Sequence, residues 1–128
     1  MTVSMPSMPR IARFALVFIV ACATGLSAGC HSSYVEADVH NASGGQVSLV
    51  EVDYPSASFG KELLPDGATF HYRFKILGSG ATKVLWTDSA HHDHTVPGPE
   101  LHEGEEGHLT VTLSGATATW DAQVHRRR

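Results

Sequence analysis

Apolar and polar residues alternate with a period of two in several segments of the chain, and this alternation constrains the fold more than any other feature. The clearest segment is residues 69–76, in which large apolar side chains share one face of an extended chain: Phe70, Tyr72, Phe74 and Ile76. Successive side chains of a strand point to opposite faces of a sheet, so such a segment predicts a strand with one buried face. Residues 34–40, 82–87, 109–113 and 116–120 show the same alternation, and no segment shows a convincing helical period.

The alternation slips in residues 46–54. Val47 and Leu49 fall on one face of an extended chain there, whereas Val50, Val52 and Tyr54 fall on the other. Such a slip predicts either a β-bulge or a central strand that is covered on both faces.

Near the end of the chain, Ser114 and Gly115 separate two alternating runs. Two turn-forming residues between such runs predict a tight β-hairpin. In that register Val111 would lie opposite Ala118, and Leu109 opposite Trp120, on the inner face.

These patterns predict an all-β fold with about seven strands, at a spacing of about ten residues, over residues 34–125. We interpret this as an immunoglobulin-like β-sandwich, with a small β-barrel as the alternative. Residues 126–128 are all arginine and are predicted to form a basic tail.

The residues before this domain have the composition of a signal peptide. Arg10 and Arg13 precede an uncharged apolar run at residues 14–24. A membrane-spanning helix needs roughly 20 apolar residues, so a run of this length is typical of the apolar part of a signal peptide and not of a permanent anchor.

Residues 26–30, Leu-Ser-Ala-Gly-Cys, follow the apolar run and resemble the lipobox of bacterial lipoprotein precursors. The resemblance covers the leader only, and it departs from the usual pattern in placing Ser27 third before the cysteine, with Leu26 one place further back. It implies a signal peptide at residues 1–29, cleavage before Cys30, and acylation of that cysteine. Since His31, and not aspartate, follows the cysteine, the resemblance implies the periplasmic face of the outer membrane in a Gram-negative envelope.

Lipidation at Cys30 would hold the domain close to the bilayer. Two or three acyl chains anchor a small domain effectively permanently. Residues 30–33 would then be the lipidated cysteine and a short tether with a reach of about 10 Å. The other cysteine, Cys22, lies within the leader, so the mature domain would have no thiol for a disulfide or a metal site.

The charge balance of the mature domain excludes some classes of function. Residues 34–125 contain thirteen Asp or Glu and four Lys or Arg. A nucleic-acid binder needs a basic face to neutralise phosphates, so we expect no nucleic-acid partner. The sequence has no Gly-x-Ser-x-Gly or glycine-rich phosphate-binding motif, and we expect no enzymatic activity.

A histidine-rich region offers an alternative function. His92 and His94 would share one face of an extended segment, and His102 and His108 could complete a set of imidazole ligands for zinc or copper. The spacing matches no established metal site. The competing interpretation is a solvated hairpin loop between Asp88 and Pro97, with no cofactor bound.

The leading hypothesis from the sequence is a non-enzymatic, membrane-anchored envelope lipoprotein whose sandwich is a structural or partner-binding module. Its partners would be the membrane, through the lipid on Cys30, and an envelope protein. The alternative hypothesis is a lipoprotein that binds zinc or copper through the region from His91 to His108.

Overall fold

The structure, a computed structural model, describes residues 32–127. These residues form eight β-strands and no helix. The strands are β1 (Val35–Asn41), β2 (Val47–Tyr54), β3 (Ala57–Leu64), β4 (Thr69–Phe74), β5 (Gly80–Thr87), β6 (Asp93–Leu101), β7 (Glu105–Ser114) and β8 (Thr117–Arg126). From Ser33 onward the residues form one compact unit. Among residues 32–127 no helix has the length and the apolar character that crossing a membrane requires.

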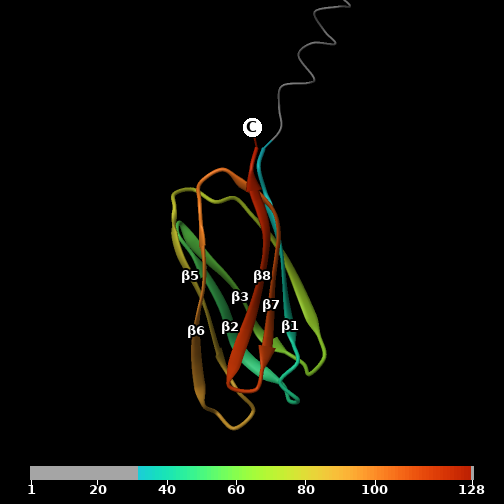
Figure 1. Cartoon of the computed structure of the whole chain (residues 1–128). Helices are drawn as coiled ribbons and strands as arrows, with labels where there is room; N and C mark the ends of the chain where they lie inside the picture. The colour runs from blue at the N-terminus through green and yellow to red at the C-terminus, as the bar shows by residue number, and fades with distance from the viewer. Residues whose placement is uncertain (1–31, 128) are drawn as a thin grey trace, which may run out of the picture. The chain divides into compact units, whose positions relative to one another are not determined.

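The strands are arranged in two four-stranded sheets, in the orders β4-β1-β7-β8 and β3-β2-β5-β6 (Figure 1). Neighbouring strands run antiparallel except β1 and β7, which run parallel. The all-β sandwich predicted from the alternation is therefore confirmed, with eight strands in place of about seven. Because the strands form two separate sheets, the chain does not form the alternative barrel.

The inward faces of both sheets supply the core. The predicted alternating runs place most of their apolar residues between the sheets, as in β1, where Val35, Ala37 and Val39 are fully buried; Tyr72 on β4 is an exception and is exposed. The largest fully buried side chains come from both sheets and from the loop after β4, which supplies Ile76: Trp86, Leu64, Ile76, Leu101, Leu109 and Leu113. Burying a large apolar side chain contributes roughly 1.5–3 kcal/mol, so this shared core is the main source of stability.

The region predicted as a loop between Asp88 and Pro97 is shorter than expected. The turn covers residues 88–92, and β6 begins at Asp93 and continues through Pro97 and Pro99. Proline has no N–H to donate to a sheet, which is why the pattern did not predict a strand here. β6 is an edge strand with β5 as its one neighbour in the sheet, so its prolines do not remove a hydrogen bond that a second neighbour would need.

The hairpin between β7 and β8 has a different register from the predicted one. Ser114 pairs with Thr117, so the turn residues are Gly115 and Ala116, and Val111 lies opposite Trp120. Gly115 has a φ of 62°, the positive value that glycine adopts most readily at the first turn position of a type II′ hairpin. Because Gly115 occupies the first turn position, Ser114 pairs with Thr117, and this pair sets the register between β7 and β8.

Candidate functional site

The histidines predicted as metal ligands do not come together. His92 ends the β5–β6 turn and His94 lies at the start of β6, whereas His102 follows the end of β6 and His108 lies on β7. Since a strand rises about 3.3 Å per residue, His94 and His102 are roughly 25 Å apart along β6. Residues 32–127 contain no group of three or more His, Cys, Asp or Glu placed to hold a metal ion.

Two of these histidines instead take part in the structure of the β5–β6 turn. The Asp88 carboxylate accepts hydrogen bonds from the backbone N–H groups of Ala90 and His92, both at 2.9 Å, and from Nε2 of His94 at 2.7 Å. The His94 ring also stacks on buried Trp86, with 5.1 Å between ring centroids. The bond from His94 and those from the backbone lower the pKa of Asp88 to about 2. This arrangement fixes the turn.

The outer face of the β3-β2-β5-β6 sheet carries exposed leucines. Leu49 on β2 and Leu63 on β3 are 65% and 51% exposed. Leu85 on β5 is partly buried and lines the same hollow as Leu49. We call the outward surface around Leu49, Leu63 and Leu85 the leucine face.

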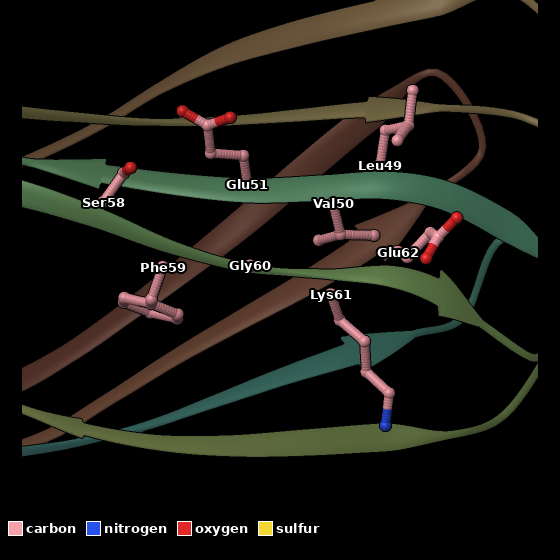
Figure 2. A pocket seen from close by; sticks show the side chains of 8 residues that line it. All are labelled: Leu49, Val50, Glu51, Ser58, Phe59, Gly60, Lys61 and Glu62. Carbon is pink, nitrogen blue, oxygen red and sulfur yellow. The ribbon is translucent and has the colours of Figure 1, made fainter.

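A β-bulge places Leu49 on this face. The pairing between β2 and β5 shifts register between Ser48 and Glu51, and Leu49 has a φ of 51°. The bulge reverses the alternation, so that Val50 points into the core while Leu49 and Glu51 point away from it (Figure 2). The slip in the sequence pattern predicted a bulge here, and that prediction is confirmed.

Glycine is required on β3 opposite the bulge. A Cβ atom on Gly60 would lie 2.2 Å from the carbonyl oxygen of Val50, a distance that real structures do not show. Gly60 therefore lets β3 approach the bulged part of β2 closely. It also leaves space on the outer face beside Leu49.

Leu49 stands between two shallow hollows that open to solvent. The first, of about 290 Å³, lies over β2 and β3 and is lined by Glu51, Ser58, Gly60 and Glu62, among others (Figure 2). The second, of about 340 Å³, lies over β2, β5 and β6 and is lined by Leu85, Trp86, Asp93 and Thr95, among others. Both are smaller or more open than a typical small-molecule pocket, which encloses most of its ligand.

Carboxylates outnumber cations around these hollows. Glu51, Glu62 and Asp93 line them, together with Lys61. The nearby Lys83 is already paired with Asp53 at 3.6 Å. A hydrogen bond with the Asp53 carboxyl group, and the charge of that group, raise the pKa of Glu51. The leucine face is thus apolar at its centre and acidic at its margin.

The outer face of the other sheet differs in character. His71 on β4 lies between Glu36 and Asp38 on β1, at 2.6 and 2.9 Å, and Arg73 lies 3.3 Å from Glu36. Hydrogen bonds to Asp38 and Glu36 raise the pKa of His71. Threonines fill much of the rest, and these charges are satisfied within the face. The leucine face is therefore the better candidate for a binding surface.

Sequence reasoning did not identify the leucine face. The signal was present as the slip at residues 46–54, because a bulge in an apolar strand must turn one of its apolar residues outward. Which residue turns outward depends on the pairing with β3 and β5, and the alternation does not contain that information. Cys30, the predicted lipidation site, lies outside the residues that the structure describes.

Comparison with protein-family models, with curated proteins and with solved structures gives no match for this chain.

Proposed function

We propose that this chain is a non-enzymatic envelope lipoprotein, anchored through lipid on Cys30, whose β-sandwich binds a partner protein through the leucine face. The leader supports the anchoring half of the proposal, because a basic segment, a short apolar run and a lipobox-like sequence follow one another. The periplasmic face of the outer membrane is the proposed location, since His31 follows the cysteine.

The conformation of Leu49 is the observation that carries the partner-binding half. A left-handed backbone conformation costs an ordinary L-residue roughly 1–2 kcal/mol, and asparagine or glycine would adopt it more readily. Leu49 also exposes 65% of its surface, so the fold gains little burial from this side chain. A strained, exposed leucine between two hollows is better explained by a partner that covers it.

The chemistry of the face indicates the kind of partner. Apolar side chains at the centre would fill the hollows beside Leu49, and lysine or arginine at the rim would meet Glu51, Glu62 and Asp93. Complementary charges of this kind increase the association rate and fix orientation more than they add affinity. The proposed partner is therefore an envelope protein with an apolar segment flanked by basic residues.

We propose that the sandwich is immunoglobulin-like in its architecture but not in its strand order. Two packed sheets built mostly from antiparallel hairpins support it. However, β1 pairs with β4 and β7, whereas the first strand of a constant-type immunoglobulin domain pairs with the second.

Site-specific photo-crosslinking in the bacterial envelope tests the partner-binding half. With p-benzoylphenylalanine in place of Leu49 in the full chain, we expect one discrete adduct with an envelope protein. The matched control carries the same probe in place of Thr119, which is exposed on the outer face of the other sheet. If neither position gives an adduct, or if both give the same adducts, the leucine face is not the binding surface.

Fractionation of a Cys30→Ser variant tests the anchoring half. Without the thiol no lipid can be attached, so we expect a high-salt wash, which removes proteins held by charge alone, to release the variant but not the wild type from the membrane fraction. A variant that stays in the membrane fraction to the same extent as the wild type would refute anchoring by lipid on Cys30.

A further inference from the structure

The chain enters and leaves the sandwich at the same end. β1 runs parallel to β7 and starts with Val35 opposite Gly107, and β8 runs back along β7 until Arg126 pairs with Glu105. Figure 1 shows the start of β1 beside the end of β8. The loops at residues 55–56, 75–79 and 102–104 close this end, which we call the tether end because Cys30 precedes β1 by only a few residues.

Hydrogen bonds join the segments of the tether end into one surface. The backbone N–H of Leu77 donates to Oγ of Ser56 at 3.3 Å, and the backbone N–H of Glu103 donates to Oγ of Ser79 at 3.0 Å. In addition, the N–H of Gly107 donates to the carbonyl of Tyr34 at 3.2 Å. The backbones of these segments are thus held in fixed relative positions.

Two large apolar side chains are exposed at the tether end. Leu77 is 59% exposed, next to fully buried Ile76, which fixes its loop to the core. Tyr34 is 37% exposed, and the Arg73 guanidinium lies 4.0 Å from the centre of its ring. Tyrosine is enriched where an apolar phase meets water, since its ring is apolar and its hydroxyl is polar.

The charges at the tether end favour an anionic partner. Lys75, Arg126 and Arg127 are exposed there, and Arg128 follows in the sequence. Among the carboxylates near this end, Glu100 and Glu103 are exposed, Glu105 is buried and accepts the N–H of His102 at 2.9 Å, Glu106 lies 3.8 Å from His125, and Glu36 lies 3.3 Å from Arg73. The exposed basic side chains therefore outnumber the exposed carboxylates at this end.

The opposite end has the reverse character. The loops at residues 42–46, 65–68, 88–92 and 115–116 contain Asp66 and Asp88, and none of these described loops contains a lysine or an arginine. A negatively charged surface would therefore attract the tether end and repel the opposite end.

We propose that the tether end is a membrane-contacting surface, in which Leu77 and Tyr34 enter the headgroup region of an anionic bilayer while Lys75, Arg126 and Arg127 meet lipid phosphates. The inference rests on the proposed lipid anchor for its setting, because a lipid on Cys30 would bring this end to the bilayer. The contact itself belongs to the folded domain. It orients the sandwich upright and leaves the leucine face, on the flank of the molecule, free for a partner.

The test uses a fragment that begins at His31 and a probe at the proposed contact. All the strand pairs and all the buried core that the structure describes lie within residues 35–126, so the fragment keeps the described fold. It lacks both native cysteines, so an environment-sensitive fluorophore can be attached at Leu77→Cys alone. The matched control carries the fluorophore at Ala116→Cys, in the exposed β7–β8 turn at the opposite end.

With vesicles of equal parts phosphatidylglycerol and phosphatidylcholine, we expect a blue shift and an intensity gain for the probe at position 77 and none at position 116. High salt or vesicles of pure phosphatidylcholine should abolish the gain. Soluble glycerophosphoglycerol at the same phosphate concentration should produce none. An unchanged probe at position 77, equal changes at both positions, or the same change with the soluble headgroup would overturn the proposal.

A second variant tests the basic residues. Each lysine or arginine near an anionic surface strengthens partitioning by roughly fivefold, so K75Q/R126Q/R127Q should weaken vesicle binding by up to about a hundredfold. Its thermal midpoint should match that of the parent, since all three side chains are exposed. Unchanged binding would refute the proposed phosphate contacts. Because the fragment has no Cys30, these results are independent of lipidation, which the Cys30→Ser variant tests separately.

Discussion

Leu49 combines a left-handed backbone conformation with an exposed apolar side chain. A substitution can change this side chain without disturbing the rest of the fold. Its neighbours Val50 and Val52 are buried, so the bulge serves the core without needing a leucine at its apex. The side chain that belongs at this conformation on backbone grounds alone is asparagine or glycine.

Replacement of Leu49 by asparagine should therefore leave stability intact. We expect the free energy of unfolding in urea to stay the same or to rise by up to about 1 kcal/mol, because asparagine tolerates positive φ. The same substitution should abolish the photo-crosslinked adduct when the probe is moved to Leu63. A loss of more than about 1 kcal/mol would mean that Leu49 is a structural residue. As a control, Leu64→Ala, at a fully buried position on β3, should lose roughly 2–5 kcal/mol.

Asp88 gives the β5–β6 turn a specific dependence on pH. Hydrogen bonds from His94 and from the backbone hold the pKa of this carboxyl at about 2, below its ordinary value of 3.8. A depressed pKa in the folded state contributes stability that is fully present above the unfolded value and is lost as the pH falls through the folded value. The relevant window is therefore about pH 4 to 2.

We expect an Asp88→Asn variant to be less stable than the wild type at pH 5 and equally stable near pH 2. The thermal midpoint of both proteins, followed by circular dichroism across this range, checks the expectation. Asp121→Asn, at an exposed position on β8, serves as the control for general charge effects. A difference in thermal midpoint between wild type and Asp88→Asn that does not change with pH would contradict the role given to the ionised Asp88 carboxylate.

At the scale of the elements, the buried end of β1 organises two turns. Asn41 is fully buried, and its Nδ2 donates to the carbonyl oxygens of Gly45, Leu64 and Pro65 at 2.8, 3.0 and 3.2 Å. Its Oδ1 accepts the N–H of Ser43 at 3.0 Å. One side chain thus joins the end of β1 to the β1–β2 turn and to the β3–β4 turn.

Removing this side chain should loosen that end of the sandwich. Asn41→Ala leaves buried carbonyl groups without a donor, so we expect a loss of roughly 1–3 kcal/mol in urea unfolding. Ser43→Ala, which removes only peripheral bonds of the same turn, should cost less. If the two variants are equally stable, Asn41 does not hold the turns together.

The sequence pattern predicted the interior of most elements and failed at positions decided by pairing. The alternation at residues 69–76 predicted a strand, and β4 covers Thr69–Phe74. The run from Asp93 to Leu101 was missed because Pro97, Gly98 and Pro99 interrupt any periodicity, although an edge strand tolerates them. The predicted register of the β7–β8 hairpin was wrong by one turn position, because either Ser114 or Gly115 could have started the turn.

The binding surface was less predictable than the fold. The clustered histidines predicted a metal site as the alternative function, yet β6 separates His94, near its start, from His102, just past its end. The leucine face could not be read from residue types, since Leu49 and buried Leu64 are chemically identical and differ only in which side of the sheet they occupy. Burial depends on tertiary pairing that alternation alone does not specify.

At the scale of the whole molecule, the described domain has distinct surfaces for distinct proposed contacts. The tether end is basic and carries exposed apolar side chains, the opposite end is acidic, and the leucine face lies along one flank. A domain held at its tether end would keep the flank accessible to a protein in the same compartment. The proposed anchor at Cys30 would bring both contacts to the membrane surface.

Mass spectrometry of the mature N-terminal peptide, taken from protein purified out of the membrane fraction, measures that anchor directly. We expect Cys30 to be the first residue and to carry a diacylglyceryl group on its sulfur and an acyl chain on its amino group. A peptide with an unmodified N-terminus, or one that still contains the leader, would contradict lipid anchoring at this position.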